Sequence, residues 1–323
     1  MRMASSQGDR GGLREHIISV VNSRKSTIVH LTHNDLDAVG ADAIHRMKYG
    51  EVTSIFSSVG KFPDILAAIS GIAGDGSILS ISDLGFRKGI ESLLITAREN
   101  GWKIEWRDHH RWNDDEIRVS ETLCDLLHVD TGTCACGICA QDLAPEDPSA
   151  LEVARVVCDY DLWKHEDPRS AVLGLVLQRR KNRDYVRDCL VRGIFTDDFI
   201  RQEYEEIRDE MESMIGKSIR KAKIYGKKYR IAFAPLYGYP SETAGRMREV
   251  LGTDIEVLVS PRGRFSLRSV PPISHILARG FHGGGHPNAA GGSFDFTFWD
   301  RLFFRLLGRS SHFDRFVDVC EST

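Results

Sequence analysis

The sequence lacks the features of a membrane or secreted protein. No apolar stretch is long enough to span a bilayer, and residues 1–12 are polar, without the apolar segment of a signal peptide. Charge of one sign is also missing, because 43 basic side chains stand against 46 acidic ones in 323 residues, which does not indicate a strongly basic nucleic-acid binder. We therefore expect a cytoplasmic globular protein with no membrane partner, holding a small anionic substrate at a local site.

Cysteine is scarce as well. The chain has seven, an odd number that does not indicate a disulfide framework. Cys134, Cys136 and Cys139 lie close together, and one interpretation is a zinc or iron–sulfur site with Cys124 or Cys158 as a fourth ligand. The spacing lacks a second C-x-x-C pair. We favour the alternative, in which these cysteines are small buried residues on a tightly packed helix.

The first half of the chain alternates short apolar runs with helix-like segments. Apolar runs typical of strands occur at 27–31, 77–82, 103–107 and 153–158, although the last could also be the end of a helix. Helices are expected at 13–25, 38–48, 62–72 and 86–100. Strands alternating with helices predict a parallel sheet with crossover connections, in which ligands bind at the carboxyl ends of the strands.

Acidic and histidine side chains follow these runs. Such side chains are ligands of hard or borderline divalent metals. Because the clusters fall where strands of one sheet would end, we interpret them as a single site of a two-metal phosphoesterase. The clusters are His33, Asp35 and Asp37; Asp83; Asp108, His109 and His110; and Asp159 with Asp161.

Roles can be assigned within the clusters. On an extended segment, the alternation of His33, Asp35 and Asp37 points all three to one side, whereas the alternative is a polar loop with Asp37 as a helix N-cap. Asp83 lies between the other clusters and is our bridging ligand. In the segment 108–110, one histidine can be a ligand oriented by the aspartate, and the other can donate to a phosphate.

Two aspartates compete for the last ligand position. We favour Asp159, because it directly follows the apolar run at 153–158. Asp161 then either supports it or caps the segment that starts at Leu162.

The chain divides into a catalytic domain (1–192), a helical linker (193–226) and a smaller α/β domain (227–323). The linker is acidic and then basic, and we interpret its basic residues as a solvated helix face rather than a nucleic-acid track. In the last domain we expect strands at 229–233, 255–259 and 264–268, a helix at 273–279 and a last helix at 299–307.

A glycine run in the last domain is typical of phosphate binding. Gly283, Gly284 and Gly285 would let backbone N–H groups approach a phosphate without obstruction by a Cβ. His286 and Asn288 follow, and Arg268 on the preceding strand could clamp a phosphate bidentately. These residues are our candidates for binding the substrate.

Together these motifs resemble the DHH phosphoesterase superfamily with its associated C-terminal domain, over about residues 27–294. The first motif is His33-Asn34-Asp35-Leu36-Asp37-Ala38-Val39-Gly40, and the others are Asp83, Asp108-His109-His110 and Asp159. Ser266-Leu267-Arg268-Ser269 and the segment 283–287 match the C-terminal domain. One residue separates His33 from Asp35, and this spacing resembles that of RecJ-like archaeal members of the superfamily.

The resemblance implies an N-terminal parallel-sheet domain, a helical linker and a C-terminal substrate-binding domain. It also implies two Mn²⁺ ions, with Mg²⁺ or Co²⁺ as alternatives. His33, Asp35 and Asp83 would hold one ion, and Asp37, Asp83, His109 and Asp159 the other. Asp83, Asp108, His109 and His110 would form the catalytic group, with His110 on the scissile phosphate. Arg268 and His286 would bind the substrate.

We expect a hydrolase of short oligonucleotides or linear dinucleotides such as pApA. A phosphatase acting on 3′-phosphoadenosine 5′-phosphate is a close alternative. A RecJ-like single-strand exonuclease is less favoured, since no additional nucleic-acid-binding domain is visible. A polyphosphatase or pyrophosphatase and a non-catalytic nucleotide-binding module complete the alternatives. The oligomeric state stays open, with a homodimer among the options.

Overall fold

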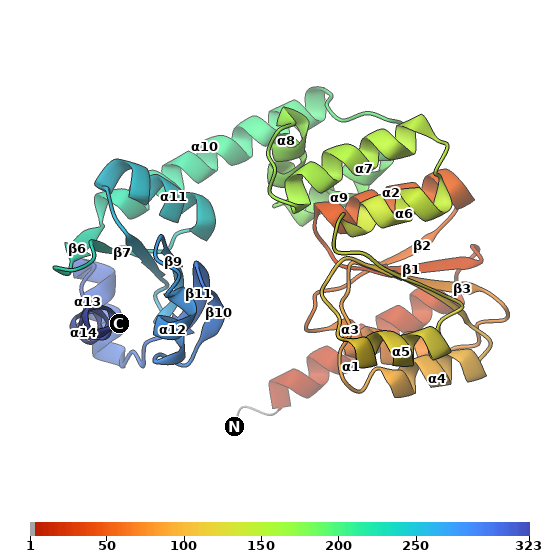
Figure 1. Ribbon diagram of the computed structural model, residues 1–323, viewed down its shortest axis with the longest axis horizontal. Helices are drawn as coiled ribbons and strands as arrows, with labels where there is room; N and C mark the ends of the chain where they lie inside the picture. The colour runs from red at the N-terminus through yellow and green to blue at the C-terminus, as the bar shows by residue number, and fades with distance from the viewer. Residues whose placement is uncertain (1–3) are drawn as a thin grey trace. The chain divides into compact units, whose positions relative to one another are not determined.

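A computed structural model of the chain describes residues 4–323, with side chains from residue 11 onward (Figure 1). The chain forms two compact units, Met1–Tyr204 (unit 1) and Glu205–Thr323 (unit 2). Helix α10 (Asp198–Arg220) runs through the boundary between them. None of the helices in the described part of the chain is both long and apolar enough to cross a bilayer.

Unit 1 contains a parallel sheet of five strands in the order β2-β1-β3-β4-β5. The strands are β1 (Ile28–Thr32), β2 (Thr53–Phe56), β3 (Ile78–Ser82), β4 (Lys103–Asp108) and β5 (Leu126–Val129). From β1 the chain moves to β2 on one side and then to β3 on the other. Parallel sheets bind ligands outside the carboxyl ends of the strands at such a change of direction. Here that point lies between β1 and β3.

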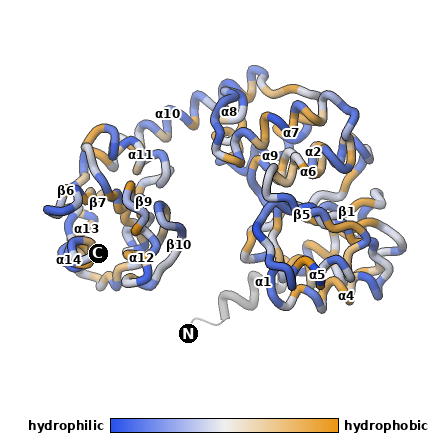
Figure 2. The backbone as a smooth tube through the Cα atoms, viewed as in Figure 1, coloured by the Kyte–Doolittle hydropathy of each residue, from blue (hydrophilic) through white to orange (hydrophobic). Residues whose placement is uncertain are grey.

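Helices cover both faces of this sheet (Figure 1). One apolar core contains residues of α1, α3 and α4, and the other residues of α2, α6, α7, α8 and α9. Along these helices, hydrophobic and hydrophilic residues alternate as an amphipathic packing requires (Figure 2). The helices are α1 (Ala4–Asn22), α2 (Leu36–Tyr49), α3 (Phe62–Ser70), α4 (Glu91–Glu99), α5 (Asp114–Leu123), α6 (Ala135–Leu143), α7 (Pro148–Asp161), α8 (Pro168–Val176), η1 (Arg180–Asn182) and α9 (Arg183–Val191).

The predicted α/β class is confirmed, and the choice left open for residues 153–158 is decided in favour of a helix. The apolar run 153–158 is not a strand but the middle of helix α7. The signals for a helix are local: Asp147 caps its N-terminus by accepting from the N–H groups of Ser149 and Ala150, and Pro148 occupies the first turn. Strands β2 and β5 were not predicted.

Unit 2 contains a six-stranded mixed sheet in the order β10-β11-β9-β8-β7-β6. Only β7 and β8 pair in parallel. Its core is rich in phenylalanine, and the rings of Phe233 and Phe313 stack 4.2 Å apart. The elements are β6 (Lys223–Tyr225), β7 (Ile231–Pro235), α11 (Pro240–Leu251), β8 (Ile255–Val259), β9 (Arg264–Ser269), α12 (Ser274–Arg279), β10 (Gly284–His286), β11 (Ala289–Ser293), α13 (Phe298–Leu307) and α14 (His312–Ser322).

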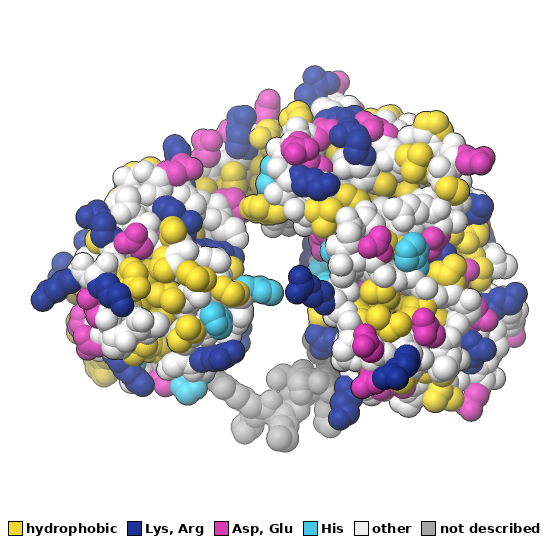
Figure 3. Space-filling view, in the orientation of Figure 1, with side chains coloured by type: hydrophobic (Ala, Val, Ile, Leu, Met, Phe, Trp, Pro, Cys, Tyr) yellow, Lys and Arg dark blue, Asp and Glu magenta, His cyan; other side chains and the backbone are white. Residues whose placement is uncertain are grey.

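Two sequence interpretations of unit 2 need correction. The helix expected at 299–307 is not the last one, because α14 follows it. The glycine run is not a loop, since Gly284–His286 pairs with β11 as strand β10. Basic and acidic side chains intermingle on the face shown in Figure 3, as the near-neutral composition suggests.

Gly40 is a packing constraint in unit 1. A Cβ at this position would lie 2.8 Å from Cys136 Sγ and 2.8 Å from Val157 Cγ2, so α2 can approach α6 and α7 only because no side chain is present. We expect Gly40→Ala to lower the free energy of unfolding by about 1–3 kcal/mol through overpacking. Gly12→Ala is the control, because nothing lies within 4 Å there. Denaturant titration that shows equal stability for the two variants would contradict the packing argument.

Glu203 connects the start of α10 to the segment 179–182, which contains η1 and follows α8. Its carboxylate accepts from Arg179, Lys181 and Asn182, and the hydrogen bonds from Lys181 and Asn182 lower the pKa of Glu203 to about 2. A carboxyl whose folded pKa is depressed stabilises the fold above its unfolded pKa, near 4.5, and loses that contribution as the pH falls towards 2. We expect Glu203→Gln to remove about 1–3 kcal/mol of stability at neutral pH and little near pH 2. Urea titrations across this pH range, with exposed Glu205→Gln as control, measure the difference.

Candidate metal centre

The predicted cluster lies between the carboxyl ends of β1 and β3, where the order in which the chain adds strands to the sheet reverses. His33 follows β1, and its Nδ1 lies 2.7 Å from Asp35 Oδ2 and 3.6 Å from Asp83 Oδ2. Asp35 is the N-cap of α2, and its other oxygen accepts from the N–H of Ala38. The first motif therefore opens a helix, but the N-cap is Asp35 and not Asp37, the alternative considered from the sequence.

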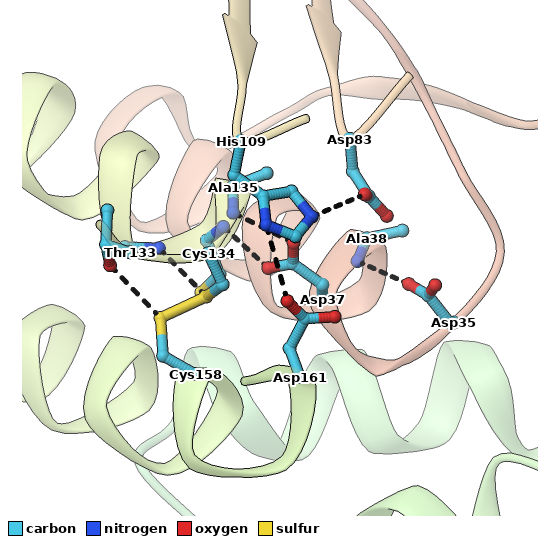
Figure 4. The surroundings of a disulfide bond; sticks show 12 residues. Asp35, Asp37, Ala38, Asp83, His109, Thr133, Cys134, Ala135, Cys158 and Asp161 are labelled. Carbon is cyan, nitrogen blue, oxygen red and sulfur yellow. Dashed lines mark hydrogen bonds and ion pairs between the residues drawn. A yellow bond between two sulfur atoms is a disulfide. The ribbon is translucent and has the colours of Figure 1, made fainter. Parts of the chain in front are cut away.

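Asp37 is buried in the first turn of α2. Its two oxygens accept from the N–H groups of Ala135 and Cys136, at 2.8 and 2.7 Å (Figure 4). These donors belong to the first turn of α6, where the helix dipole also favours a negative charge. The start of α6 therefore holds the carboxylate in place.

Asp83 stands in the middle of the site. Its φ of 53° lies in the left-handed region, which is uncommon for a residue other than glycine and occurs often at functional sites. Its Oδ1 lies 3.4 Å from His109 Nε2. Among the side chains that the structure describes, three groups could hold a metal ion, and Asp83 belongs to two of them. The groups are His33, Asp35 and Asp83; Asp37, His109 and Asp161; and Asp83, His109 and His110.

For the fourth motif, the structure favours Asp161 over Asp159, the residue preferred from the sequence. Asp161 Oδ2 lies 3.5 Å from His109 Nδ1 (Figure 4). The carboxylate of Asp159 is instead occupied by the following loop, where it accepts from the N–H groups of Glu166 and Asp167 and from the Ser170 hydroxyl. The physical reason is helical phase: on α7, residues two apart point in different directions.

The electrostatics of the site show an excess of negative charge. Burial, followed by the nearby charge of Asp83, raises the pKa of Asp37 well above its ordinary value. Burial likewise raises the pKa of Asp161 to about 6. Burial opposes protonation of His109, but its hydrogen bond to Asp83 and the charges of Asp37 and Asp161 raise its pKa to about 9. Burial and the close approach of several carboxylates therefore both disfavour the charged form of these aspartates.

These residues fit divalent metal ions. Asp83 Oδ2 and Asp161 Oδ2 are buried and form no hydrogen bond, since the imidazole nitrogens nearest to them, of His33 and His109, lie at 3.6 and 3.5 Å. A buried carboxylate oxygen without a donor is costly unless a cation meets it. Oxygen and imidazole ligands suit Mn²⁺ and Mg²⁺, so both the donor set and the two open oxygens match such ions.

Asp108 lies behind His110, which belongs to one of the three ligand groups. Asp108 is buried at the end of β4, and its oxygens lie 2.9 Å from His110 Nδ1 and accept from the indole N–H of Trp112 at 2.7 Å. The hydrogen bond between His110 and Asp108 raises the pKa of His110. The aspartate of the third motif therefore orients His110, which the sequence had suggested as the phosphate donor.

The cysteines lie next to the site. Cys134 and Cys158 form a disulfide that joins the start of α6 to α7 (Figure 4). The sequence did not predict it, since the two residues are 24 positions apart. Cys136 and Cys139 are free and buried on α6, which agrees with the packed-helix interpretation. No group of metal-ligating side chains in the described residues includes a cysteine.

A buried polar network under the site was missed by the sequence analysis. His30 lies 2.8 Å from both Asp42 Oδ1 and Ser82 Oγ, and its ring stacks on His45 at 3.9 Å. His45 in turn contacts the hydroxyl of Ser80. The network ties α2 to β3, the strand that carries Asp83. The only signal for this network in the sequence was a histidine at an inward-facing position of a strand, His30, and of a helix, His45.

The substrate-binding candidates of unit 2 lie on β9, β10 and the turn before β11. Ala289 pairs with His286 on one side and with Arg268 on the other, so all three share one face of the sheet. The small Ala289 leaves space between Arg268 and His286, whose Cα atoms are roughly 10 Å apart at two strand spacings. Asn288 instead donates to the carbonyls of Ser269 and Val270 and holds the turn.

The glycines beside His286 allow close strand packing. A Cβ on Gly283 would lie 1.9 Å from the carbonyl oxygen of Gly291, and one on Gly285 would lie 2.6 Å from that of Ala289. Gly284 is exposed with nothing within 4 Å. Backbone contact with β11 therefore explains Gly283 and Gly285, and only Gly284 has open space beside it.

No family model and no curated protein sequence matches the chain. Solved structures do. The pGpG-specific phosphodiesterase PggH from Vibrio cholerae is 12% identical with a TM-score of 0.55, covering 87% of this chain and 98% of that one. RecJ from Thermus thermophilus in complex with Mn²⁺ is 18% identical with a TM-score of 0.52, covering 96% of this chain but 55% of RecJ. The chain has the RecJ-type DHH fold.

A third structure with this DHH fold is an exopolyphosphatase-related protein from Bacteroides fragilis. It is 14% identical with a TM-score of 0.52, and the match covers 96% of each chain. The DHH fold is therefore shared at low identity by proteins whose names indicate different phosphate-containing substrates. The likeness confirms the expected fold and leaves the substrate to the residues of this chain.

The two aspartates of the fourth motif should respond differently to the same substitution. Asp161→Asn removes a ligand candidate, and we expect Mn²⁺ affinity to fall at least about ten-fold, while the metal-free protein keeps or gains stability through reduced like-charge repulsion. Asp159→Asn weakens the hydrogen bonds to the loop 166–170, and we expect a loss of about 1–3 kcal/mol in stability with metal affinity retained.

Isothermal titration calorimetry with Mn²⁺ and thermal unfolding of the metal-free variants separate these effects. A fall in metal affinity for Asp159→Asn with none for Asp161→Asn would restore the assignment made from the sequence.

Proposed function

We propose that the chain is a two-metal, Mn²⁺-dependent phosphoesterase that cleaves phosphodiester bonds in short oligonucleotides or linear dinucleotides. The observation that carries the proposal is the sharing of Asp83 and His109 among three ligand groups at the carboxyl ends of β1, β3 and β4. Shared ligands are what two neighbouring ions require. The bound Mn²⁺ of RecJ and the activity in the name of PggH support this interpretation.

The ligands divide into two sets. His33, Asp35 and Asp83 would hold one ion, and Asp37, Asp83, His109 and Asp161 the other. Bound divalent ions supply a nucleophile at neutral pH and offset the negative charge that develops on the phosphate.

The protein's own contribution is positioning. The α6 N–H groups fix Asp37, and Asp108 fixes the ring of His110 through Nδ1. With Nδ1 engaged, Nε2 is the ring nitrogen of His110 that can donate to the scissile phosphate. Its raised pKa favours the protonated, donating form.

A pocket next to the ligands supports a short substrate. It has a volume of about 340 Å³ and adjoins Asp35 at the start of α2. This size is at the lower end for small-molecule sites and suits one small unit rather than a polymer. Asn34 and Gln178 offer hydrogen-bonding amides on its wall, and exposed Arg180 pairs with no carboxylate among the described residues. Such a lining suits a nucleotide.

Unit 2 supplies a second place for phosphate. Arg268 is half-buried and is oriented by Ser241, whose hydroxyl accepts from its guanidinium at 2.9 Å. His286 is exposed on the same face of the sheet. Two donors flanking a small residue suit a terminal phosphate of a short strand.

The decisive experiment measures product formation with Mn²⁺ on a substrate series. The series contains pApA, RNA of two to five nucleotides, long single-stranded DNA, 3′-phosphoadenosine 5′-phosphate and polyphosphate. We expect the rate to fall steeply with strand length, because the pocket beside Asp35 accepts one small unit. Preference for the long strand would indicate a RecJ-like exonuclease, and preference for the mononucleotide or polyphosphate would indicate turnover of phosphate metabolites.

Asp83→Ala is the control for the chemistry in this experiment. It removes the ligand that both proposed ions share, so all activities of the series should disappear while the circular dichroism spectrum is retained. Full activity of this variant would refute the two-metal site, whichever substrate is preferred.

A further inference from the structure

Helix α13 of unit 2 exposes a large apolar surface that the proposed catalysis does not use. Its exposed side chains, which we call the α13 face, are Phe298 (72%), Trp299 (63%), Leu302 (39%), Phe303 (54%), Leu306 (70%) and Leu307 (60%). Single exposed apolar residues are ordinary on protein surfaces, but six on one ten-residue helix are not. Such a surface needs an explanation.

The α13 face is a consequence of how the helix is fixed in unit 2. Phe304 is the one buried side chain of α13, and its ring packs against those of Phe296 and Phe313. A capping box between Thr297 and Asp300 fixes the N-terminus. At about 100° per residue, the α13 face is centred opposite Phe304. The helix therefore docks on one side and presents its apolar arc outward.

The area of the α13 face matches that of a protein–protein interface. Large side chains exposed to this degree contribute on the order of 100 Å² each, so the face offers roughly 600–700 Å². This exceeds the largest apolar patch of a typical monomer, about 300–600 Å². Two such faces together would bury about 1,200–1,400 Å², which reaches the range of stable, specific interfaces.

We propose that the α13 face binds the α13 face of a second copy of this chain, forming a twofold-symmetric homodimer. An apolar helix face is complementary to itself, as a twofold interface requires, and two helices can interdigitate the rows formed by residues 298, 302 and 306.

The charges around the α13 face argue against an anionic lipid surface as the occupant. The basic residues of the helix, Arg301 and Arg305, lie on one side of the arc only, with Asp300 near the other. A helix lying on a membrane carries cations across its whole polar face. The chain as a whole is also acidic, with a net charge of −3. A second copy fits this distribution better than an anionic bilayer.

Size-exclusion chromatography with light scattering, across a wide range of protein concentrations, tests the proposal. We expect wild-type protein to have twice the chain mass, and Phe303→Glu and Leu306→Glu each to shift the dissociation constant at least about a hundred-fold towards monomer, since a charge is then buried in the interface. Val250→Glu on α11 is the matched control, because Val250 is 56% exposed outside the α13 face. It should remain dimeric.

Thermal unfolding separates loss of association from loss of folding, because α13 residues that face solvent in a monomer tolerate glutamate. A monomeric wild-type protein would overturn the proposal, including the case in which it sediments with anionic vesicles. A dimer unaffected by both α13 substitutions would also overturn it. Neither result depends on the metal site, so the dimer and the proposed hydrolysis are tested independently.

Discussion

The structure of unit 1 depends on holding several carboxylates together in a partly buried space. Asp35, Asp37, Asp83 and Asp161 converge with His33, His109 and His110. Burial, together with the neighbouring carboxylates, raises the pKa of Asp37, Asp83 and Asp161. Like charges at such distances separate unless the scaffold opposes them. Each carboxylate is therefore attached to a rigid element: the start of α2, the end of β3 or the end of α7.

Rigidity of these elements comes from polar contacts that are themselves buried. The N–H groups at the start of α6 hold Asp37, and the disulfide between Cys134 and Cys158 joins that start to α7, three residues before Asp161. Beneath them, His30 connects Asp42 of α2 to Ser82, the neighbour of Asp83. A well-satisfied polar network fixes geometry more narrowly than apolar packing, because each hydrogen bond has a preferred direction. The candidate ligands are consequently held in position by the buried network beneath them.

The sequence predicted those parts of the site that depend on strand ends. Apolar runs followed by His33, Asp83 and Asp108 can only deliver these residues to one edge of a parallel sheet. The prediction failed at the fourth motif, where the direction of each side chain depends on its position around helix α7. The run before Asp159 suits a strand as well as a helix, and a strand ending there would have placed Asp159 in the site. The disulfide and the buried histidine network join segments far apart in the chain, and no local pattern encodes such contacts.

The candidate metal ligands and the lining of the neighbouring pocket come from different parts of the sequence. The ligand groups come from motifs that the DHH fold places at one sheet edge, whereas the pocket near Asp35 is lined by Gln178 and Arg180, outside all four motifs. In unit 2, Arg268 and His286 do lie in segments that match the C-terminal motifs, but their spacing depends on the strand register around Ala289. The motifs therefore predict metal-dependent phosphate chemistry, whereas the proposed substrate rests also on side chains and spacings that the motifs do not specify.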